Sequence, residues 1–289
     1  MIEPTDLLTV ARDVTVRAFL FDTARYGVAA CLMAAIVWAL GFTAWRTRRI
    51  QPRRAKPSDY RREILSSLQS VAVYTVVSIL TVWMYRNGWL MRWDGEVTAL
   101  GFVGMLTAMV VAHDAYFYWS HRAMHHRALF RTFHLHHHKS TTPTPFAAYA
   151  FAVPEALVMT LFMPLWLALV PTPEPVIFVF LAVMIVRNVM GHAGLELHPR
   201  GWASHPVLKW ISTTTHHDMH HCGRFDRNFG FYFTFWDKLM GTEHPDYVQR
   251  FNEVTTPGPK GELPTLSPAP VMAGFAALVV GAATVGWIL

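Results

Sequence analysis

The stretch from Tyr26 to Trp45 holds twenty residues that are almost all apolar, and it limits what this chain can fold into. A helix of that length spans roughly the 30 Å hydrocarbon layer of a bilayer. The whole chain of 289 residues is 53% hydrophobic and only 15% charged, which excludes an ordinary soluble domain. We predict an all-α integral membrane helical bundle with five or six spans. The further apolar runs are residues 64–84, 98–118, 146–170, 175–190 and 270–289.

The two ends of the chain carry weaker signals. Residues 1–25 mix acidic, basic and apolar side chains, and we expect an amphipathic N-terminal segment there, followed by one membrane domain over 26–289. Acidic residues precede the first apolar run, so we expect no cleavable signal peptide. Residues 270–289 either cross the membrane or lie against the bundle. The two cysteines, Cys31 and Cys222, form no CxxC motif and indicate no disulfide framework.

A short basic segment sets the expected orientation. Residues 46–62 contain eight lysines and arginines directly after the first apolar run. Basic loops favour the cytoplasmic side of a membrane, so we expect this loop in the cytoplasm. Counting spans from there brings the histidine-rich stretches 113–138 and 192–221 to the cytoplasmic side as well. The same loop accounts for the net charge of +6, and we expect no nucleic-acid partner.

Histidines provide the strongest chemical signal. Seven of the sixteen fall between Trp119 and His138. Residues three or four apart share one face of a helix, and this spacing recurs in three histidine motifs. Eight imidazoles exceed the three or four ligands of one zinc ion, so we predict a dinuclear metal site in a cytoplasmic histidine-rich cap. No thiolate accompanies them, which disfavours iron–sulfur chemistry and Cu(I). Eight histidines around two metals leave room for an exogenous ligand, so a redox-active pair that binds O₂ is favoured over structural zinc. The motif histidines are His121 and His125; His134, His137 and His138; and His217, His220 and His221.

These motifs resemble those of the fatty acid hydroxylase and sterol desaturase superfamily of membrane di-iron oxygenases. The resemblance rests on HRAMH, HLHHH, HDMHH and the trailing NFG…WDKLMGT, and it covers roughly residues 112–242. It implies a histidine-box core that holds two iron ions, which zinc can replace in purified protein, with O₂ as co-substrate. It also implies a separate electron donor, either cytochrome b5-like or a ferredoxin with its reductase. His192, in GHAGLEL, occupies the place of a ninth ligand in this family.

Four further residues are weaker candidates for metal ligands. Members of the family can carry a histidine where this chain has Glu196; a carboxylate would also bind iron, and His198 competes with it. His113 and His216 lie near the motif histidines but at less favourable helical angles. These four candidates leave the coordination number open.

Several carboxylates are candidates for supporting roles. Asp114, Asp218 and Asp237 could accept hydrogen bonds from the outer nitrogens of metal-bound imidazoles; the alternative is a solvated cap residue or a salt bridge. Glu155 lies within an apolar run, where an ionisable group indicates a functional role unless it is hydrated near the membrane interface.

The resulting hypothesis is a membrane-bound di-iron oxygenase that uses O₂ and external electrons to hydroxylate a C–H bond of a membrane lipid. Two alternatives stay open: a lipid or sterol desaturase with the same site, and a non-catalytic metal-binding membrane scaffold. The sequence does not distinguish a fatty acyl chain from a sterol-like or other lipid. We expect a multi-pass protein of a bacterial inner membrane, with its metal site facing the cytoplasm.

Overall fold

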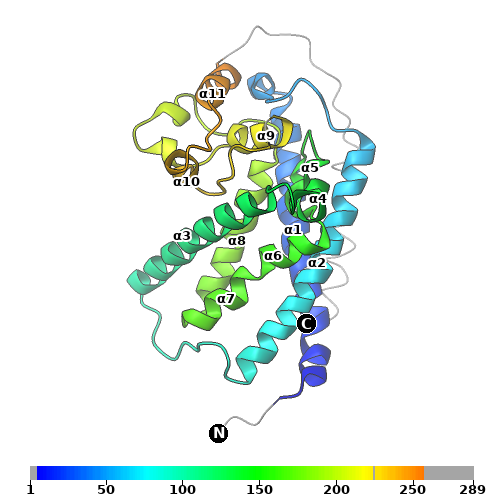
Figure 1. Ribbon diagram of the computed structural model, residues 1–289, viewed down its shortest axis with the longest axis vertical. Coiled ribbons are helices and arrows are strands. Elements are labelled where there is room, and N and C mark those ends of the chain that lie inside the picture. Colours follow the sequence, from blue (N-terminus) through cyan, green and yellow to red (C-terminus); the bar gives the residue numbers. More distant parts are fainter. Residues whose placement is uncertain (1–4, 224, 257–289) are drawn as a thin grey trace.

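The computed structural model describes residues 5–223 and 225–256, and the regular elements within them are helical (Figure 1). Strand pairing in these residues is limited to two isolated bridges, Arg49 with Leu195 and Ile211 with Phe233. The all-α prediction is therefore confirmed for this part of the chain. In chain order the elements are α1 (Leu7–Leu40), η1 (Ala44–Arg48), α2 (Pro57–Arg86), α3 (Ala99–Met124), α4 (Phe130–Phe133), α5 (Leu135–His138), η2 (Pro145–Tyr149), α6 (Val153–Thr160), α7 (Phe162–Leu169), α8 (Glu174–Gly191), η3 (Trp202–Ser204), η4 (Leu208–Trp210), α9 (Thr214–Cys222), α10 (Phe235–Leu239) and α11 (Tyr247–Thr255).

Four helices in the described part of the chain, α1, α2, α3 and α8, are long and apolar enough to cross a membrane. Three of them begin at residues that favour a helix start. Asp6 accepts a hydrogen bond from the Thr9 amide before α1, Thr98 accepts one from the Gly101 amide before α3, and Pro57 opens α2. The protein is therefore an integral membrane protein with these four helices as candidate spans.

Small and aromatic side chains join the long helices. Tyr26 and Ala30 of α1 pack with Val71 of α2 and Val189 of α8 in one buried cluster. The Tyr26 hydroxyl also donates a hydrogen bond of 2.9 Å to the carbonyl of Phe146, in η2. Lipid offers no hydrophobic drive between helices, so close packing and such interhelical hydrogen bonds hold the bundle together.

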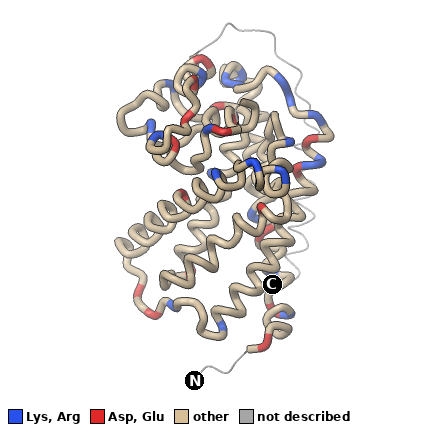
Figure 2. The backbone as a smooth tube through the Cα atoms, viewed as in Figure 1, with Lys and Arg blue, Asp and Glu red and all other residues tan. Residues whose placement is uncertain are grey.

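The shorter helices α4, α5, α9, α10 and α11 gather at one end of the bundle (Figure 1). The segment between α1 and α2 joins them there: the Ile50 amide bonds to the Gly194 carbonyl at 3.2 Å, and the Glu196 amide bonds to the Arg48 carbonyl at 3.0 Å. Many of the lysines and arginines lie at this end, including those of the predicted basic loop (Figure 2). We call this end the cap.

The first span differs from the prediction. α1 is one continuous helix from Leu7, with no break between an amphipathic segment and a span starting at Tyr26. Residues 7–40 contain no proline, so nothing interrupts the hydrogen-bond ladder before Gly41. The helix ends at Leu40, with Gly41 as its C-cap, and does not continue to Trp45 as predicted.

The predicted span over 146–170 is also not one helix. Its start forms the turn η2, and α6 and α7 follow it, meeting at Leu161. Pro164 in α7 cannot donate the backbone hydrogen bond that a continuous helix needs at that position. The joined segment Val153–Leu169 is too short to count as a span. The candidate span 270–289 lies outside the described residues.

Candidate metal centre

Five histidines from three parts of the chain form a first group. His121 and His125 lie one turn apart at the end of α3, and they meet residues from the α4–α5 segment and from α9. One ring nitrogen of each histidine lies within 4.8 Å of the others. This five-histidine group consists of His121, His125, His134, His138 and His220.

Four histidines form a second group beside the first. His192 directly follows α8, His137 comes from α5, and His217 and His221 lie one turn apart on α9. Their ring nitrogens also lie within 4.8 Å of one another, and all four side chains are buried. The groups touch: the ring centroids of His138 and His221, one from each group, are 5.1 Å apart. The structure thus brings all nine predicted histidine ligands together, in two adjacent sets.

Hydrogen bonds on the outer side of the rings fix which nitrogen carries the proton. In four of the nine rings Nδ1 faces a carbonyl or carboxylate oxygen, which can only accept. Nδ1 must therefore be protonated, and Nε2 presents its lone pair to the group. The four bonds run from His121 to the Phe229 carbonyl (3.0 Å), from His134 to Glu155 Oε1 (2.6 Å), from His192 to the Asn188 carbonyl (2.8 Å) and from His220 to the Arg227 carbonyl (2.7 Å).

This arrangement fits metal ions. His121 Nε2 and His134 Nε2 are 2.9 Å apart. With Glu155 ionised, both rings carry their proton on Nδ1, so no hydrogen lies between the two nitrogens. Protonation of the pair is no remedy, because burial holds the pKa of His134 well below its usual value. A cation among the converging lone pairs removes the repulsion. Neutral imidazoles without thiolates suit iron or zinc.

The NFG…WD motif positions one of these rings. Asp237 accepts hydrogen bonds from the amides of Phe229 (2.9 Å) and Gly230 (2.7 Å), which fixes the Phe229 carbonyl that His121 needs. A Cβ on Gly230 would lie 2.4 Å from the Phe233 carbonyl, so only glycine fits there. Burial raises the pKa of Asp237 to about 6. The motif is therefore a support for the metal group.

The predicted role of the three aspartates needs correction. None of them receives a hydrogen bond from a ring of either group within the described residues. Asp114 accepts from the backbone amide of Tyr232 at 2.9 Å, Asp218 accepts from Gln51 Nε2 at 2.9 Å, and Asp237 holds the loop described above. Glu155, and not one of the aspartates, accepts a hydrogen bond from a ring of the two groups, that of His134. The three backbone carbonyl acceptors carry no sequence signal, because any residue type supplies a carbonyl.

The four weaker ligand candidates lie outside both groups. Glu196 uses both carboxylate oxygens elsewhere: Oε1 accepts from His198 and Oε2 from Thr215. Although burial raises the pKa of Glu196, these hydrogen bonds outweigh it and hold that pKa below its usual value. His216 lies beside Ser212, 3.5 Å from Asp237. His113 packs among phenylalanines of α3, α7 and α8.

The fold and the site define a helical membrane protein with two adjacent histidine groups at one end of its spans, and each group could hold a metal ion. Residues 106–242, which contain all nine histidines, match the fatty acid hydroxylase family. The resemblance to the fatty acid hydroxylase and sterol desaturase superfamily is therefore confirmed for this core of the chain.

Proteins of known activity share this core. Lathosterol oxidase of Mus musculus is 31% identical over 163 residues, which are 56% of this chain and 49% of that protein. Cholesterol 25-hydroxylase of Rattus norvegicus is 33% identical over 142 residues, 48% of this chain and 46% of that protein. A very-long-chain aldehyde decarbonylase of Oryza sativa subsp. japonica is 39% identical over 140 residues, 46% of this chain and 22% of that protein.

The chain thus spans about half the length of the sterol-modifying relatives, and less of the decarbonylase. No solved structure matches the chain significantly.

Proposed function

We propose that this protein is a membrane di-iron oxygenase that hydroxylates a C–H bond of a membrane lipid. The proposal rests on the two buried histidine groups, one of five residues and one of four. The lone pairs of their ring nitrogens point toward one another, as they would around a cation. The superfamily and the sterol-oxidising relatives support the same reading.

The nine histidines would hold two iron ions, which supply the binding and reduction of O₂ when bound. The protein's own residues do the rest. The Phe229 carbonyl and Glu155 hold His121 and His134 in the required tautomer. Burial keeps the histidines neutral and excludes water from the oxidant.

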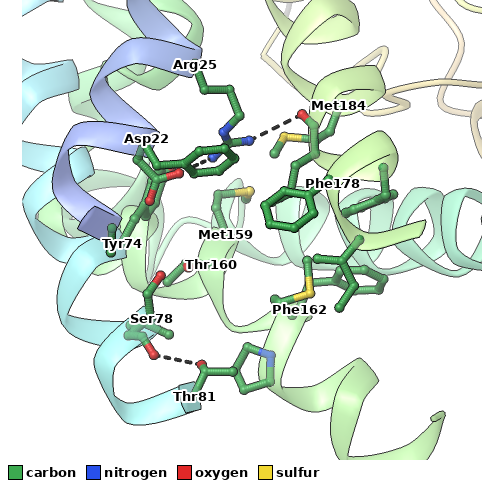
Figure 3. Close-up of a pocket in the computed structure, with 18 of the residues that line it drawn as sticks. Asp22, Arg25, Tyr74, Ser78, Thr81, Met159, Thr160, Phe162, Phe178 and Met184 are labelled. Atoms are coloured by element: carbon green, nitrogen blue, oxygen red, sulfur yellow. Dashed lines mark hydrogen bonds and ion pairs between the residues drawn. The ribbon is translucent and has the colours of Figure 1, made fainter. Parts of the chain in front are cut away.

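A cavity of about 480 Å³ among α1, α2, α3, α7 and α8 is the proposed substrate site (Figure 3). Its lining is mostly apolar, as a lipid requires. Phe117 and Phe151 line the cavity and also touch the metal groups: their rings lie 5.1 Å from His121 and 5.0 Å from His137, measured between centroids. Because these two histidines belong to different groups, one aromatic ring separates the cavity from each group.

The overall reaction requires an external reductant. In hydroxylation, one atom of O₂ enters the C–H bond and the other leaves as water, with two electrons and two protons supplied from outside. In desaturation, two hydrogen atoms leave the lipid and both oxygen atoms become water, with the same external supply. The relatives include an oxidase and a hydroxylase, so the core supports either outcome. A cytochrome b5-like protein or a ferredoxin is the proposed donor.

The proposed orientation brings the cap to the cytoplasm. The basic segment 46–62 lies at the same end of the bundle as the histidine groups (Figure 2). Backbone hydrogen bonds join its residues Arg48 and Ile50 to Glu196 and Gly194. Basic loops favour the cytoplasmic face, where soluble electron donors are available. A bacterial inner membrane is the proposed location.

Lipid mass spectrometry tests the proposal. Membranes from cells that make the wild-type protein under air should contain a lipid that has gained one oxygen atom. Membranes with His137→Ala should lack it, and membranes with His126→Gln should retain it, because exposed His126 belongs to neither group. A lipid that lost two hydrogen atoms would instead identify a desaturase. Identical lipids with wild type and His137→Ala would refute the oxygenase and favour a metal-binding scaffold.

A further inference from the structure

The wall of the cavity contains a buried ion pair. Asp22 and Arg25 lie three residues apart on α1, and Arg25 Nη2 is 2.6 Å from Asp22 Oδ1 (Figure 3). Their side chains are only 9% and 11% exposed. Ionisable groups are costly within a membrane-spanning helix, and they mark functional sites by default.

This pair does more than join helices. Arg25 Nη1 donates to the Leu181 carbonyl of α8 at 3.3 Å, which links α1 to α8. The Arg25 Nε–H and the Tyr149 hydroxyl, however, are buried without a hydrogen bond of good geometry in the described part of the chain, although the two side chains interact with each other. Arg25 Cζ lies 5.8 Å from the centre of the Tyr149 ring, so these unused groups are close together in the cavity wall. Leaving buried polar groups unpaired costs free energy, which an oxygen atom of a ligand would recover.

We propose that Arg25 and Tyr149 bind the polar group of the lipid substrate, and that this group is a neutral hydroxyl or carbonyl. Asp22 already balances the charge of Arg25 at 2.6 Å, so the site as a whole is neutral. A lipid carboxylate would add a second negative charge beside Asp22 in a region of low dielectric, which is unfavourable. The inference deepens the proposed function, because it takes the cavity to be the substrate site.

The position of the ion pair also sets which part of the lipid reacts. Leu181, which Arg25 contacts, precedes His192 by eleven residues, or roughly 16 Å along a helix at 1.5 Å per residue. A lipid held by its oxygen at Arg25 therefore presents a remote carbon to the metal groups, and not the carbons next to the polar group.

The cavity borders the lipid between α1 and α8. Phe21 and Phe178 line the cavity, are 41% and 54% exposed on the outer surface, and meet edge to face with centroids 5.6 Å apart. One layer of side chains thus separates the cavity from the bilayer, the source of a neutral lipid.

A binding measurement tests the inference without any turnover. The detergent-solubilised, iron-loaded protein is titrated under argon with stearyl alcohol, octadecane or stearate, which differ only in the polar end. The wild type should bind the alcohol about tenfold or more tightly than octadecane, and more tightly than stearate. The double variant Asp22→Leu/Arg25→Met, which leaves no unpaired charge, should lose this preference.

Two further variants keep the test decisive. Thr75→Val removes a hydroxyl of α2 that lies outside the cavity and bonds to Val71, so the preference should stay. Tyr149→Phe keeps the ring and removes the hydroxyl, so it should weaken the binding of the alcohol alone. This single variant tests the inference even if the double variant does not fold. Equal binding of alcohol and octadecane by the wild type, or tighter binding of stearate, would overturn the inference.

Turnover is a separate measurement. With an electron supply and air, stearyl alcohol should be oxidised in the half of the chain remote from its hydroxyl. Oxidation next to the hydroxyl would contradict the proposed anchor. An absence of any oxidation alongside an intact alcohol preference would refute the oxygenase and leave the binding site standing.

Discussion

Glu155 shows how one buried carboxylate serves the metal groups. It lies in an otherwise apolar helix, is 1% exposed, and accepts the Nδ1–H of His134 at 2.6 Å. Such a partner fixes the orientation of a ligand and raises its basicity. Glu155→Gln keeps the shape but removes the charge, so we expect the metal affinity of the five-histidine group to fall about 10- to 100-fold, measured by competition with a chelator.

Glu63 offers the matched control. It is equally buried and close to the same end of the bundle, but it interacts with Thr144 and Arg62 and not with a histidine. Glu63→Gln should leave metal affinity unchanged even if it lowers the free energy of unfolding. If both glutamine variants lose the same affinity, the effect of Glu155 is one of general stability, and its proposed role is wrong.

At the scale of elements, α9 divides its histidines between the two groups. His217 and His221, one turn apart, face the four-histidine group, while His220 faces the five-histidine group. His221→Ala leaves three ligands in its group and His220→Ala leaves four. When challenged with a chelator, the His221→Ala protein should lose about one metal ion per chain, and the His220→Ala protein should lose a smaller fraction of its bound metal. Elemental analysis of the folded protein measures this difference.

The same helix supplies the control for that experiment. His216 is buried on α9 but belongs to neither group, so His216→Gln should retain the metal content of the wild type. An equal loss from all three variants would mean that α9 merely supports the fold, and that the division of its histidines has no chemical meaning.

The sequence predicted the features that depend on local periodicity. Spacings of three and four residues identified eight of the nine histidines, because helical geometry alone brings such residues to one face. The resemblance to the superfamily added His192. The partition into two groups depends on how α5 and α9 face each other, so neighbours such as His137 and His138 separate in a way that spacing does not reveal. The carbonyl acceptors likewise depend on tertiary contacts.

At the scale of the whole molecule, the histidine groups lie in the cap and the cavity lies among the spans (Figure 3), with the rings of Phe117 and Phe151 between them. The cap holds the ligands on short buried helices, supported by loops such as the one that Asp237 organises. In the proposed function, the long helices form a site that a lipid occupies without leaving the membrane. This division would separate the recognition of the lipid from the chemistry.

The number of iron ions tests the central claim most directly. Metal-stripped wild-type protein is titrated with Fe(II) under argon, and bound iron per folded chain is measured by elemental analysis. Two groups of converging neutral imidazoles predict two tightly bound ions per chain. Binding of a single ion, or of none by a protein whose thermal unfolding shows it to be folded, would contradict the dinuclear site and the oxygenase chemistry that depends on it.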